Sequence, residues 1–325
     1  MNKLEQGYLL RHPKMEDLPE VVDLINITSA AFGDAEVGAN IDEMAKFWES
    51  DETEMERDLW VVESPTGQIV GYEEMENRFQ HCVLAGDGYV HPKHRGKGVG
   101  TALLKALIER GKEEISLAPA NAKVFIRNGF GANEINAMDM YKDLGFSVSR
   151  YHWRMQIDLQ ALPELVPLPE GIRLEPFDVD MHDHLLWEAH HDAFKDHWGH
   201  VLRPYTYWLD HVRGFAEFDP ALWLVAWDGD EIAGYSLNRR KSGIGWVSTF
   251  GVRRPWRRRG LGYALLTRSF RVMYQAGLSR IGLTVDSQNP TGATRLYERA
   301  GMSIANHYIV VDKILREGED MTDVS

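Results

Sequence analysis

The sequence has a single cysteine, Cys82, in 325 residues. One thiol cannot build a disulfide framework, and low cysteine content is typical of proteins in a reducing cytosol. No apolar run approaches the roughly 20 residues that a membrane-spanning helix needs. The N-terminal residues 1–18 also lack the apolar core of a signal peptide. These absences predict a soluble, cytoplasmic protein that does not bind a membrane.

Positive charge is scarce: 36 Lys and Arg stand against 49 Asp and Glu, a net charge of −13. Binding to nucleic acid needs a broad basic face, so this balance argues against a nucleic-acid partner. One short segment is basic although the chain as a whole is acidic, and it carries Arg253, Arg254, Arg257, Arg258 and Arg259. A local arginine cluster in an acidic chain predicts a site for one small polyanion.

Motifs for several other sites are also absent. The sequence contains no GK[ST] motif of an NTPase and no HExxH zinc motif, and its histidine-rich segment 182–197 has no cysteine nearby. We therefore expect no metal. A Rossmann dehydrogenase is disfavoured because the glycine-rich turns follow late strands, and no acidic strand end lies about 20 residues further on.

The chain is organised around residues 250–271, FGVRRPWRRRGLGYALLTRSFR. This stretch predicts a strand that ends near Val252, a basic turn, and a helix with Leu265 and Leu266 on its apolar face. Gly260 and Gly262 allow close backbone approach to a ligand. Unpaired amides at the start of a helix attract negative charge, so the turn predicts an anion site, most plausibly for a pyrophosphate.

The pattern occurs twice, which indicates a duplicated domain. Val90, Arg95, Gly98 and Gly100 recur 162 residues later as Val252, Arg257, Gly260 and Gly262. Asn133, Ala137, Tyr141 and Gly145 recur 156 residues later as Asn289, Ala293, Tyr297 and Gly301. The difference of six residues places an insert in the first copy, within residues 111–132. We expect domains at 1–160 and 172–316, a proline-containing linker at 161–171, and a disordered acidic tail at 317–325.

Both repeated motifs resemble those of the GNAT acetyltransferases. R-x-x-G-x-G at 95–100 and 257–262 is similar to that family's acyl-CoA signature, and 289–302 is similar to its N-x-x-x-A-x-x-L-Y-x-x-x-G-[FM] motif. The resemblance covers nearly the whole chain, and its tandem arrangement is similar to that of the mycothiol synthases. It implies an α/β fold with a mixed sheet and two tandem GNAT domains.

The resemblance also implies acetyl-CoA as co-substrate and assigns roles to particular residues. Tyr297 would be the general acid, with Tyr141 its counterpart in the first copy, and the main-chain amide near Val252 would polarise the thioester oxygen. The cofactor-binding residues would be Val252, Arg257, Arg258, Arg259, Gly260, Leu261, Gly262, Tyr263 and Asn289 in the second copy, and Val90, Arg95, Gly96, Lys97, Gly98 and Gly100 in the first.

The general base is missing from its expected place. Many relatives have a glutamate on the strand before the turn, but residues 245–250 contain no carboxylate, and the first copy's 84–88 offers only Asp87. This departure argues against mycothiol synthesis itself and suggests a water relay or a base elsewhere. Asp196, His197 and Trp198 lie in the segment that covers the acceptor pocket in this family. We expect them to bind the acceptor or remove its proton, although an exposed histidine cluster at a helix end is an equally good interpretation.

These features predict transfer of acetyl from acetyl-CoA to a primary amine, on a small molecule such as an aminoglycoside, polyamine or amino sugar. Acetylation of a peptide or protein amine and non-catalytic acyl-CoA sensing remain as alternatives. The second copy has the fuller motifs, so we expect it to be catalytic. The first would be structural or weakly active, because its insert is expected where its cleft should form.

Overall fold

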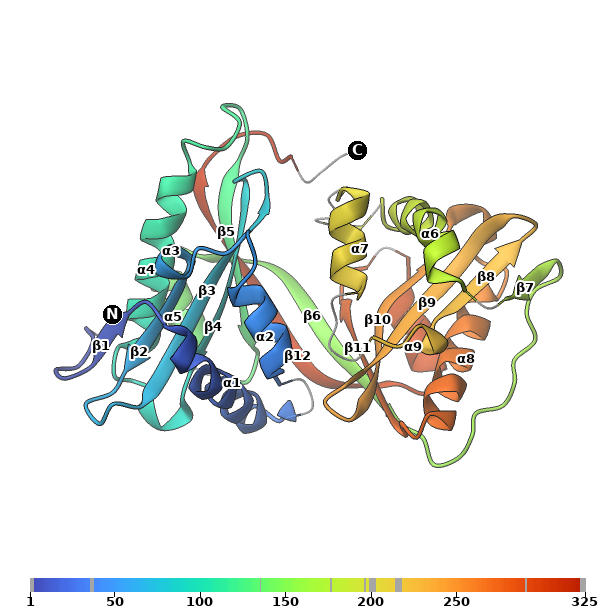
Figure 1. Cartoon of the computed structure of the whole chain (residues 1–325), viewed down its shortest axis with the longest axis horizontal. Helices are drawn as coiled ribbons and strands as arrows, with labels where there is room; N and C mark the ends of the chain where they lie inside the picture. The colour runs from blue at the N-terminus through green and yellow to red at the C-terminus, as the bar shows by residue number, and fades with distance from the viewer. Residues whose placement is uncertain are drawn as a thin grey trace. The chain divides into compact units, whose positions relative to one another are not determined.

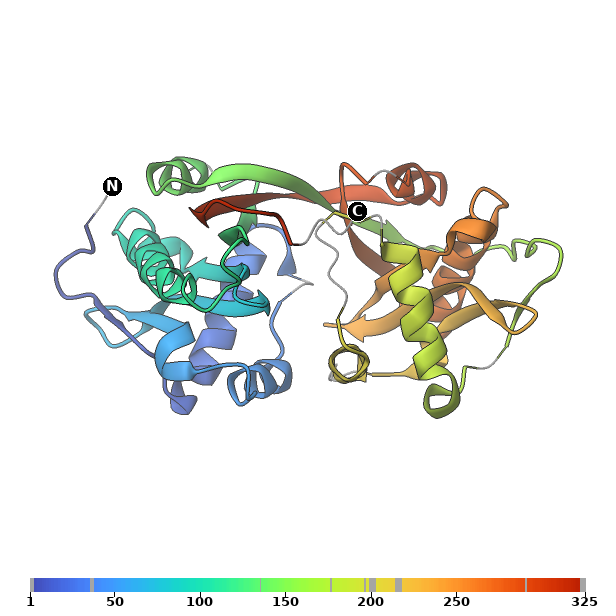
Figure 2. The same cartoon turned by 90° about the horizontal axis from the view of Figure 1, so that it is seen from above.

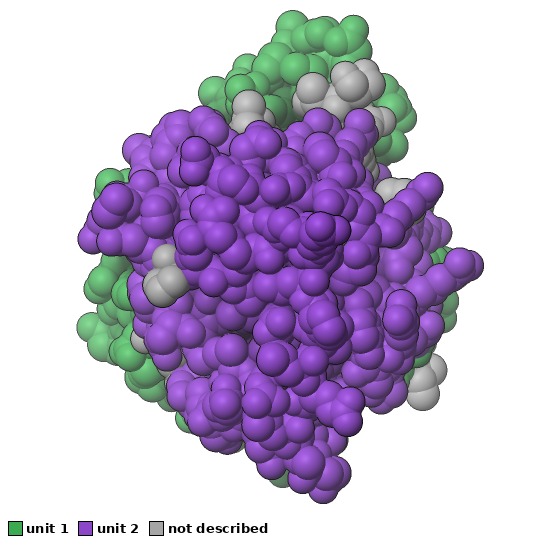
Figure 3. Space-filling model, turned by 90° about the vertical axis from the view of Figure 1, so that its right-hand side faces the viewer, with its two compact units in different colours: residues 1–152, 306–321 green, residues 153–305, 322–325 purple. Residues whose placement is uncertain are grey.

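The computed structural model describes residues 3–35, 38–134, 136–175, 177–195, 197–198, 203–213, 218–289 and 291–321, and the chain folds into two compact units. Unit 1 combines residues up to 152 with residues 306–321, and unit 2 contains residues 153–305 (Figure 3). No helix within the described ranges is long and apolar enough to cross a bilayer.

Unit 1 is built on a mixed sheet with the strand order β1-β2-β3-β4-β5-β12. Neighbouring strands are antiparallel except β4 and β5, which are parallel. Its strands are β1 (Leu9–Arg11), β2 (Leu59–Glu63), β3 (Ile69–Phe79), β4 (Val83–Val90), β5 (Val124–Gly131) and β12 (Ser303–Arg316). Its helices are α1 (Leu18–Ala31), α2 (Ile41–Trp48), α3 (Met55–Asp58), α4 (Val99–Glu114) and α5 (Ala137–Asp143).

Alternation along β2 explains why helices cover both faces of this sheet. Leu59 and Val61 pack with α1 and α2, whereas Trp60 and Val62 pack with α4. Side chains two residues apart share a face of a strand, so an all-apolar strand buries both faces. Figure 1 shows α4 on one side of the sheet and α1 with α2 on the other.

Unit 2 repeats the plan with the strand order β6-β11-β10-β9-β8-β7, in which β10 and β11 are parallel. Helices α6 and α7 pack on one face with Tyr235 and Leu237, and α8 packs on the other with Ala226 and Ala233. The strands are β6 (Ser147–Asp158), β7 (Ile172–Leu174), β8 (Leu224–Asp228), β9 (Glu231–Lys241), β10 (Ile244–Val252) and β11 (Arg280–Asp286). The helices are α6 (Val179–Phe194), α7 (Tyr205–Arg213), α8 (Leu261–Gln275) and α9 (Ala293–Arg299).

The last strand of each copy contributes to the other copy's unit, so the compact units differ from the domains expected at 1–160 and 172–316. From residue 306 onward β12 belongs to unit 1, where it pairs antiparallel with β5 (Figure 2). Arg127 on β5 donates two hydrogen bonds of 2.9 Å to Asp312 on β12. The end of β6 belongs to unit 2, where Asp158 accepts a 2.6 Å bond from Arg280. Repeat spacing reveals that a strand exists but not which open sheet edge it joins.

The expectation of a disordered acidic tail is wrong for residues 317–321. The Glu319 backbone accepts a hydrogen bond from Lys123 N and donates one to Asn121 O, both at 2.8 Å. Arg316, just before it, donates to the carbonyl oxygens of Pro119 and Ala122. Residues 317–321 are therefore held by the loop between α4 and β5.

The insert of the first copy is confirmed, but its expected place at the cleft is wrong. The extra residues lie between the end of α4 and the start of β5, and they bury Ala118 and Ala122 in the unit 1 core. A cleft between parallel strands forms at their carboxyl ends. The insert instead meets the amino end of β5.

Candidate active site

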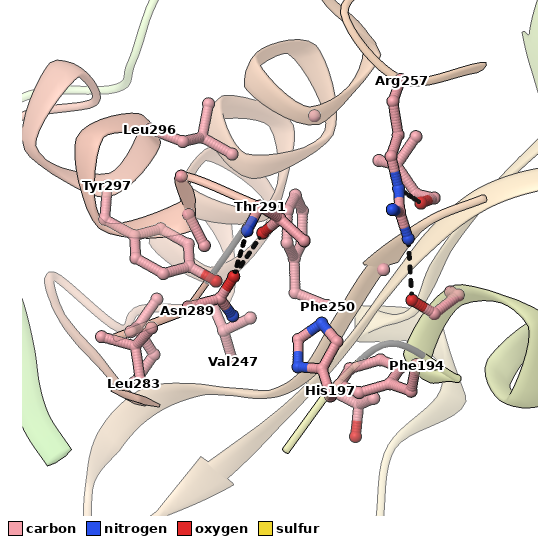
Figure 4. Close-up of a pocket in the computed structure, with 18 of the residues that line it drawn as sticks. Phe194, His197, Val247, Phe250, Arg257, Leu283, Asn289, Thr291, Leu296 and Tyr297 are labelled. Atoms are coloured by element: carbon pink, nitrogen blue, oxygen red, sulfur yellow. Dashed lines mark hydrogen bonds between the residues drawn. The ribbon is translucent and has the colours of Figure 1, made fainter. Parts of the chain in front are cut away.

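A pocket of about 860 Å³ opens in unit 2 where β10 and β11 separate (Figure 4). Their parallel pairing is limited to Gly245 with Ile281 and Trp246 with Gly282. Beyond Trp246 the pocket is lined by α6, β10, the turn before α8, β11 and α9. Small-molecule sites commonly have volumes of roughly 300–1,000 Å³, so the pocket is large enough for a cofactor arm and an acceptor.

One wall of the pocket is an edge of β10 that pairs with no neighbouring strand beyond Trp246 in the described structure. Arg253 N donates to Ala233 O at 3.0 Å, so Arg253 and Ala233 form a hydrogen-bonded pair between β10 and β9. In an antiparallel ladder the bonded pairs alternate, so Val252 and Phe250 direct their N–H and C=O groups away from β9. Both residues line the pocket. An extended ligand could therefore bind this edge as an added strand would.

The turn before α8 forms the mouth of the pocket. Gly260 caps α8 with φ = 85°, and no atom lies within 4 Å of the place where its Cβ would be. Arg258 also adopts a positive φ of 61°. Arg258, Gly260, Gly262 and Tyr263 line the pocket, whereas Leu261 is buried in the core and Arg259 is outside the lining. The turn leaves open space in front of the first amides of α8, which suits an anion.

Arg257 supports the turn from within. Its Nε donates to Val252 O and its second terminal nitrogen to Ala193 O, both at 2.9 Å (Figure 4). The side chain thus ties α6 to the end of β10. Arg254, Arg258 and Arg299 also line the pocket. The guanidinium of Arg299 lies 4.4 Å from the centre of the Tyr263 ring.

Helix α9 and the loop before it supply the opposite wall. Tyr297 is 6% exposed and lines the pocket, with its ring 6.3 Å from that of Phe250. Within the described part of the chain, its hydroxyl has no hydrogen-bond partner. Burial raises the pKa of Tyr297, so the hydroxyl keeps its proton at neutral pH. Asn289 also lines the pocket, and its Oδ1 shapes the loop by accepting bonds from Thr291 N at 2.9 Å and Thr291 Oγ1 at 2.5 Å.

The α6 side brings one of the three predicted acceptor residues into the pocket. His197 lines it, whereas Trp198 is 37% exposed and lies outside the lining. Asp196 falls outside the described residues. The sequence pattern missed Phe194 and His190, which also line the pocket. Their helix was conspicuous for its histidines, but composition alone does not show which of them face a cavity.

His190 is held in place through a buried tyrosine. Its Nδ1 is 3.0 Å from the hydroxyl of Tyr235, which is fully buried on β9. That hydroxyl lies against Gly251, where an added Cβ would be 2.7 Å away. The glycine thus allows Tyr235 to reach His190. Among the residues that can be described, no three His, Cys, Asp or Glu gather closely enough to hold a metal.

The corresponding turn of unit 1 is covered by the chain's own N-terminal segment. A Cβ on Gly98 would lie 2.5 Å from Lys3 O and 2.7 Å from Leu4 N. Glu5 N donates to Lys97 O at 3.1 Å. The Leu4 side chain packs on the unit 1 core. Gly98 and Gly260 have similar backbone angles, but only Gly260 faces open space.

The other residues predicted to bind a cofactor in unit 1 have neighbours of their own. The Arg95 guanidinium lies 4.5 Å from the Phe32 ring centre, and a Cβ on Gly100 would be 3.1 Å from the Met140 sulfur. Val90 packs against the unit 1 core, and Gly96 has φ = 78°. These residues lie at the turn, where Arg95 and Gly100 already have close neighbours, and their role in cofactor binding remains a prediction.

Unit 1 also contains a buried polar chain that the sequence did not reveal. The Tyr141 hydroxyl donates to Asn128 Oδ1, and Asn128 Nδ2 donates to Glu73 Oε1, both at 3.0 Å. Burial raises the pKa of Glu73 well above the usual range of a carboxyl group. Asp87, the carboxylate noted on β4, is instead exposed and accepts a 2.9 Å bond from Tyr89.

Comparisons with known sequences agree with this geometry. Residues 183–302 match the Acetyltransferase (GNAT) family and residues 56–148 match the Acetyltransferase (GNAT) domain. The mycothiol acetyltransferase of Streptomyces scabiei is 32% identical over 240 residues, which is 72% of each chain. That of Salinispora arenicola is 27% identical over 88% of this chain and 91% of its own.

Two solved structures are similar to this chain over nearly its whole length. A GCN5-related N-acetyltransferase from Sphaerobacter thermophilus has a TM-score of 0.84 and 33% identity, covering 98% of this chain and 99% of its own. A tandem GNAT protein from the clavulanic acid biosynthesis pathway has a TM-score of 0.72 over 96% of this chain and 100% of its own, and at 14% identity it supports the fold alone. The chain is therefore an N-acetyltransferase of the GNAT family, built from two GNAT domains in tandem.

Proposed function

We propose that unit 2 transfers acetyl from acetyl-CoA to the single primary amine of a small molecule. One observation carries the proposal: an open glycine turn and a tyrosine hydroxyl without a hydrogen-bond partner among the described residues belong to the same pocket. Gly260 contributes the turn and Tyr297 the hydroxyl. When bound, the thioester supplies an acyl group that is already activated for attack.

The residues present fit this co-substrate. The first amides of α8 would receive the diphosphate, with Arg258 adding charge at the mouth. The edge of β10, through Phe250 and the N–H of Val252, would hold the pantetheine arm by main-chain hydrogen bonds, since Arg257 already occupies Val252 O. An amide on that edge, at Val252, would face the thioester oxygen and stabilise the charge that develops there.

The reaction forms a C–N bond as the C–S bond breaks, so the amine loses one proton and the thiolate gains one. Tyr297 would donate the proton toward sulfur. Burial raises its pKa, but the same apolar surroundings also disfavour the thiolate and raise the pKa of the departing thiol. Proton transfer therefore remains feasible within the pocket.

Removal of the amine proton is assigned to the α6 side. A primary amine with a pKa of about 10.4 is largely protonated at neutral pH and needs a proton acceptor. Residues 245–250 of β10 contain no carboxylate. His197 lines the pocket beside Phe194, and we propose that it accepts this proton directly or through water.

The charges of the pocket narrow the acceptor class. Its described lining contains four arginines, at 254, 257, 258 and 299, and one carboxylate, Asp286. This balance disfavours a polycation such as a polyamine, although the whole chain is acidic. It supports an acceptor with one amine and neutral polar groups, for example an amino sugar. The relatives named mycothiol acetyltransferase also suggest a small acceptor.

Unit 1 is proposed to be structural. Its turn is covered at Gly98, and the Tyr141 hydroxyl is occupied by Asn128. In unit 2, by contrast, the turn at Gly260 faces open space and Tyr297 lines the pocket.

A thiol-release assay tests the proposal. Purified protein with acetyl-CoA is given glucosamine, spermidine and a lysine-containing peptide. We expect glucosamine to release thiol fastest. Faster release with the peptide would favour a protein acetyltransferase, whereas calorimetric binding of acetyl-CoA without release by any amine would favour a sensor and contradict the proposal.

A further inference from the structure

Strand β11 presents different residues to the two faces of the unit 2 sheet. Leu283 and Val285 pack in one core cluster with side chains of α8 and α9. Side chains alternate along a strand, so Thr284 and Asp286 lie on the opposite face. That face is the one on which α6 and α7 pack. All four residues line the pocket, which therefore has lining on both faces of the strand.

Strand β10 divides its pocket-lining residues in the same way. Thr249 pairs with Leu237 of β9, which packs with α6 and α7, so Thr249 lies on the α6 face. Phe250 instead packs with the α8 cluster, as Tyr297 does. The α8 face of the pocket is thus mainly apolar and suits an acyl arm. The α6 face carries hydroxyls and a carboxylate, and it suits a polar acceptor.

Asp286 is the one carboxylate among the described residues that line the pocket. Its side chain is half-buried, and Thr284 on the same face is exposed, so this part of the wall is accessible. Asp286 Oδ1 accepts a 2.8 Å hydrogen bond from Gln288 N. A carboxylate has about four acceptor positions, so that bond leaves capacity for a ligand.

The position of Asp286 along the strand matches that of the proposed acyl site. It lies four residues beyond Gly282, and Phe250 lies four residues beyond Trp246, the last pair of the two parallel strands. Residues advance at nearly the same rate along neighbouring strands, so Asp286 and Phe250 stand at a similar height on either side of the opening. An amine beside Asp286 would approach the opening from the α6 face.

We propose that Asp286 binds the acceptor's amine on the α6 face and directs it through the opening toward the acyl carbon, a role that rests on the proposed acetyl transfer by unit 2. The carboxylate accepts N–H bonds from the protonated amine. It takes up no proton itself, since the proton leaves toward the α6 side before the C–N bond forms. A single carboxylate also explains why the acceptor should carry a single amine.

The substitution Asp286→Asn tests the role with little change in shape. Asn keeps an Oδ1 that can accept from Gln288 N, so the loop should be retained and the melting temperature should change by less than about 2 °C. With the amine that releases thiol fastest, expected to be glucosamine, kcat/KM should fall roughly ten- to thirtyfold, mainly through KM. That is the loss of one hydrogen bond to a charged group. The KM for acetyl-CoA should change less than about twofold.

Asp230→Asn is the matched control. Asp230 is exposed in the turn between β8 and β9 and does not line the pocket. The variant loses the same charge from the chain, so it reports any effect of net charge alone. Its kcat/KM for the amine should equal that of the wild type.

The outcomes separate this inference from the function on which it rests. An unchanged kcat/KM in Asp286→Asn would show that Asp286 only shapes the loop, and it would overturn the inference while leaving acetyl transfer intact. A change confined to the KM for acetyl-CoA, or an equal loss in Asp230→Asn, would overturn it in the same way. Absence of thiol release with every amine in the wild-type protein would overturn both.

Discussion

The hydroxyl of Tyr141 donates a 3.0 Å hydrogen bond to Asn128 Oδ1 in the interior of unit 1. Its counterpart by repeat position, Tyr297, has no such bond in the described structure and lines the pocket of unit 2. Two tyrosines at equivalent sequence positions therefore have different freedom to react. Both tyrosines belong to the same sequence motif, and they differ because Tyr141 has Asn128 as a hydrogen-bond partner.

Replacing Tyr297 with Phe should lower kcat on the order of 100-fold, because a positioned proton donor contributes at least that much. The KM for acetyl-CoA should change little, since the ring that packs in the pocket is retained. Steady-state thiol release would measure both constants.

Tyr141→Phe should leave turnover unchanged and destabilise the fold by about 1 kcal/mol, because Asn128 loses a buried partner. Urea unfolding of the two variants would provide the comparison. If Tyr141→Phe abolished turnover and Tyr297→Phe did not, the assignment of the catalytic copy would be reversed.

Calorimetric titration should find one acetyl-CoA bound per chain. Gly260→Val should abolish that binding, because a bulky side chain would fill the open mouth and strain a residue at φ = 85°. Gly277→Val is the control, since Gly277 has φ = 86° and equally open space but lies outside the pocket lining. Gly277→Val should introduce the same backbone strain and still bind acetyl-CoA. A stoichiometry of two would contradict the structural role of unit 1.

Loosening the N-terminal segment should uncover the turn of unit 1. Leu4→Glu places a charge where Leu4 packs on the core, whereas Leu9→Glu changes a residue that is 55% exposed. We expect Leu4→Glu to raise protease cleavage near the N-terminus and Leu9→Glu to have no effect. Equal cleavage rates for the two variants would show that Leu4 does not anchor the segment.

Arg299→Ala should weaken acetyl-CoA binding about three- to tenfold, in the range of a partly exposed charge-assisted contact. Arg299 stacks on Tyr263 at the pocket, whereas Arg295 is exposed one turn earlier on α9 and does not line it. Arg295→Ala is therefore the matched control and should bind normally. The effect should shrink at high salt. Equal weakening by both variants would instead indicate a general effect of net charge.

Acid should destabilise unit 1 through Glu114. Burial alone would raise the pKa of Glu114, but hydrogen bonds from His81 and Arg110 outweigh it and lower the pKa below its usual 4.5. A carboxylate with a lowered folded pKa stabilises the fold above its unfolded pKa, and this contribution is lost as pH falls through the folded value.

Glu114→Gln should therefore cost about 3 kcal/mol at pH 7 and flatten the fall in stability below about pH 4.5. Glu113→Gln is the control, because the side chain of Glu113 is 59% exposed. Urea unfolding between pH 7 and about pH 3 would measure both. An unchanged pH slope in Glu114→Gln would remove Glu114 as the cause.

Much of the local structure was predictable because it depends on short segments. The spacing of apolar residues after Gly98 and Gly260 predicts α4 and α8, and both glycines adopt the positive φ that favours glycine. The repeat predicted an insert in the first copy, which is confirmed between α4 and β5. The roles assigned to Tyr297 and His197 remain predictions, although both residues line the same pocket.

The sequence by itself determined the duplication, the two glycine turns and the family, since each depends on the identity and spacing of nearby residues. Tertiary structure decided that β12 joins β5 and that Lys3 and Leu4 cover Gly98. These properties depend on which distant segments meet. A short-range pattern sets backbone conformation, but it does not encode the long-range contacts that leave one turn open and cover the other.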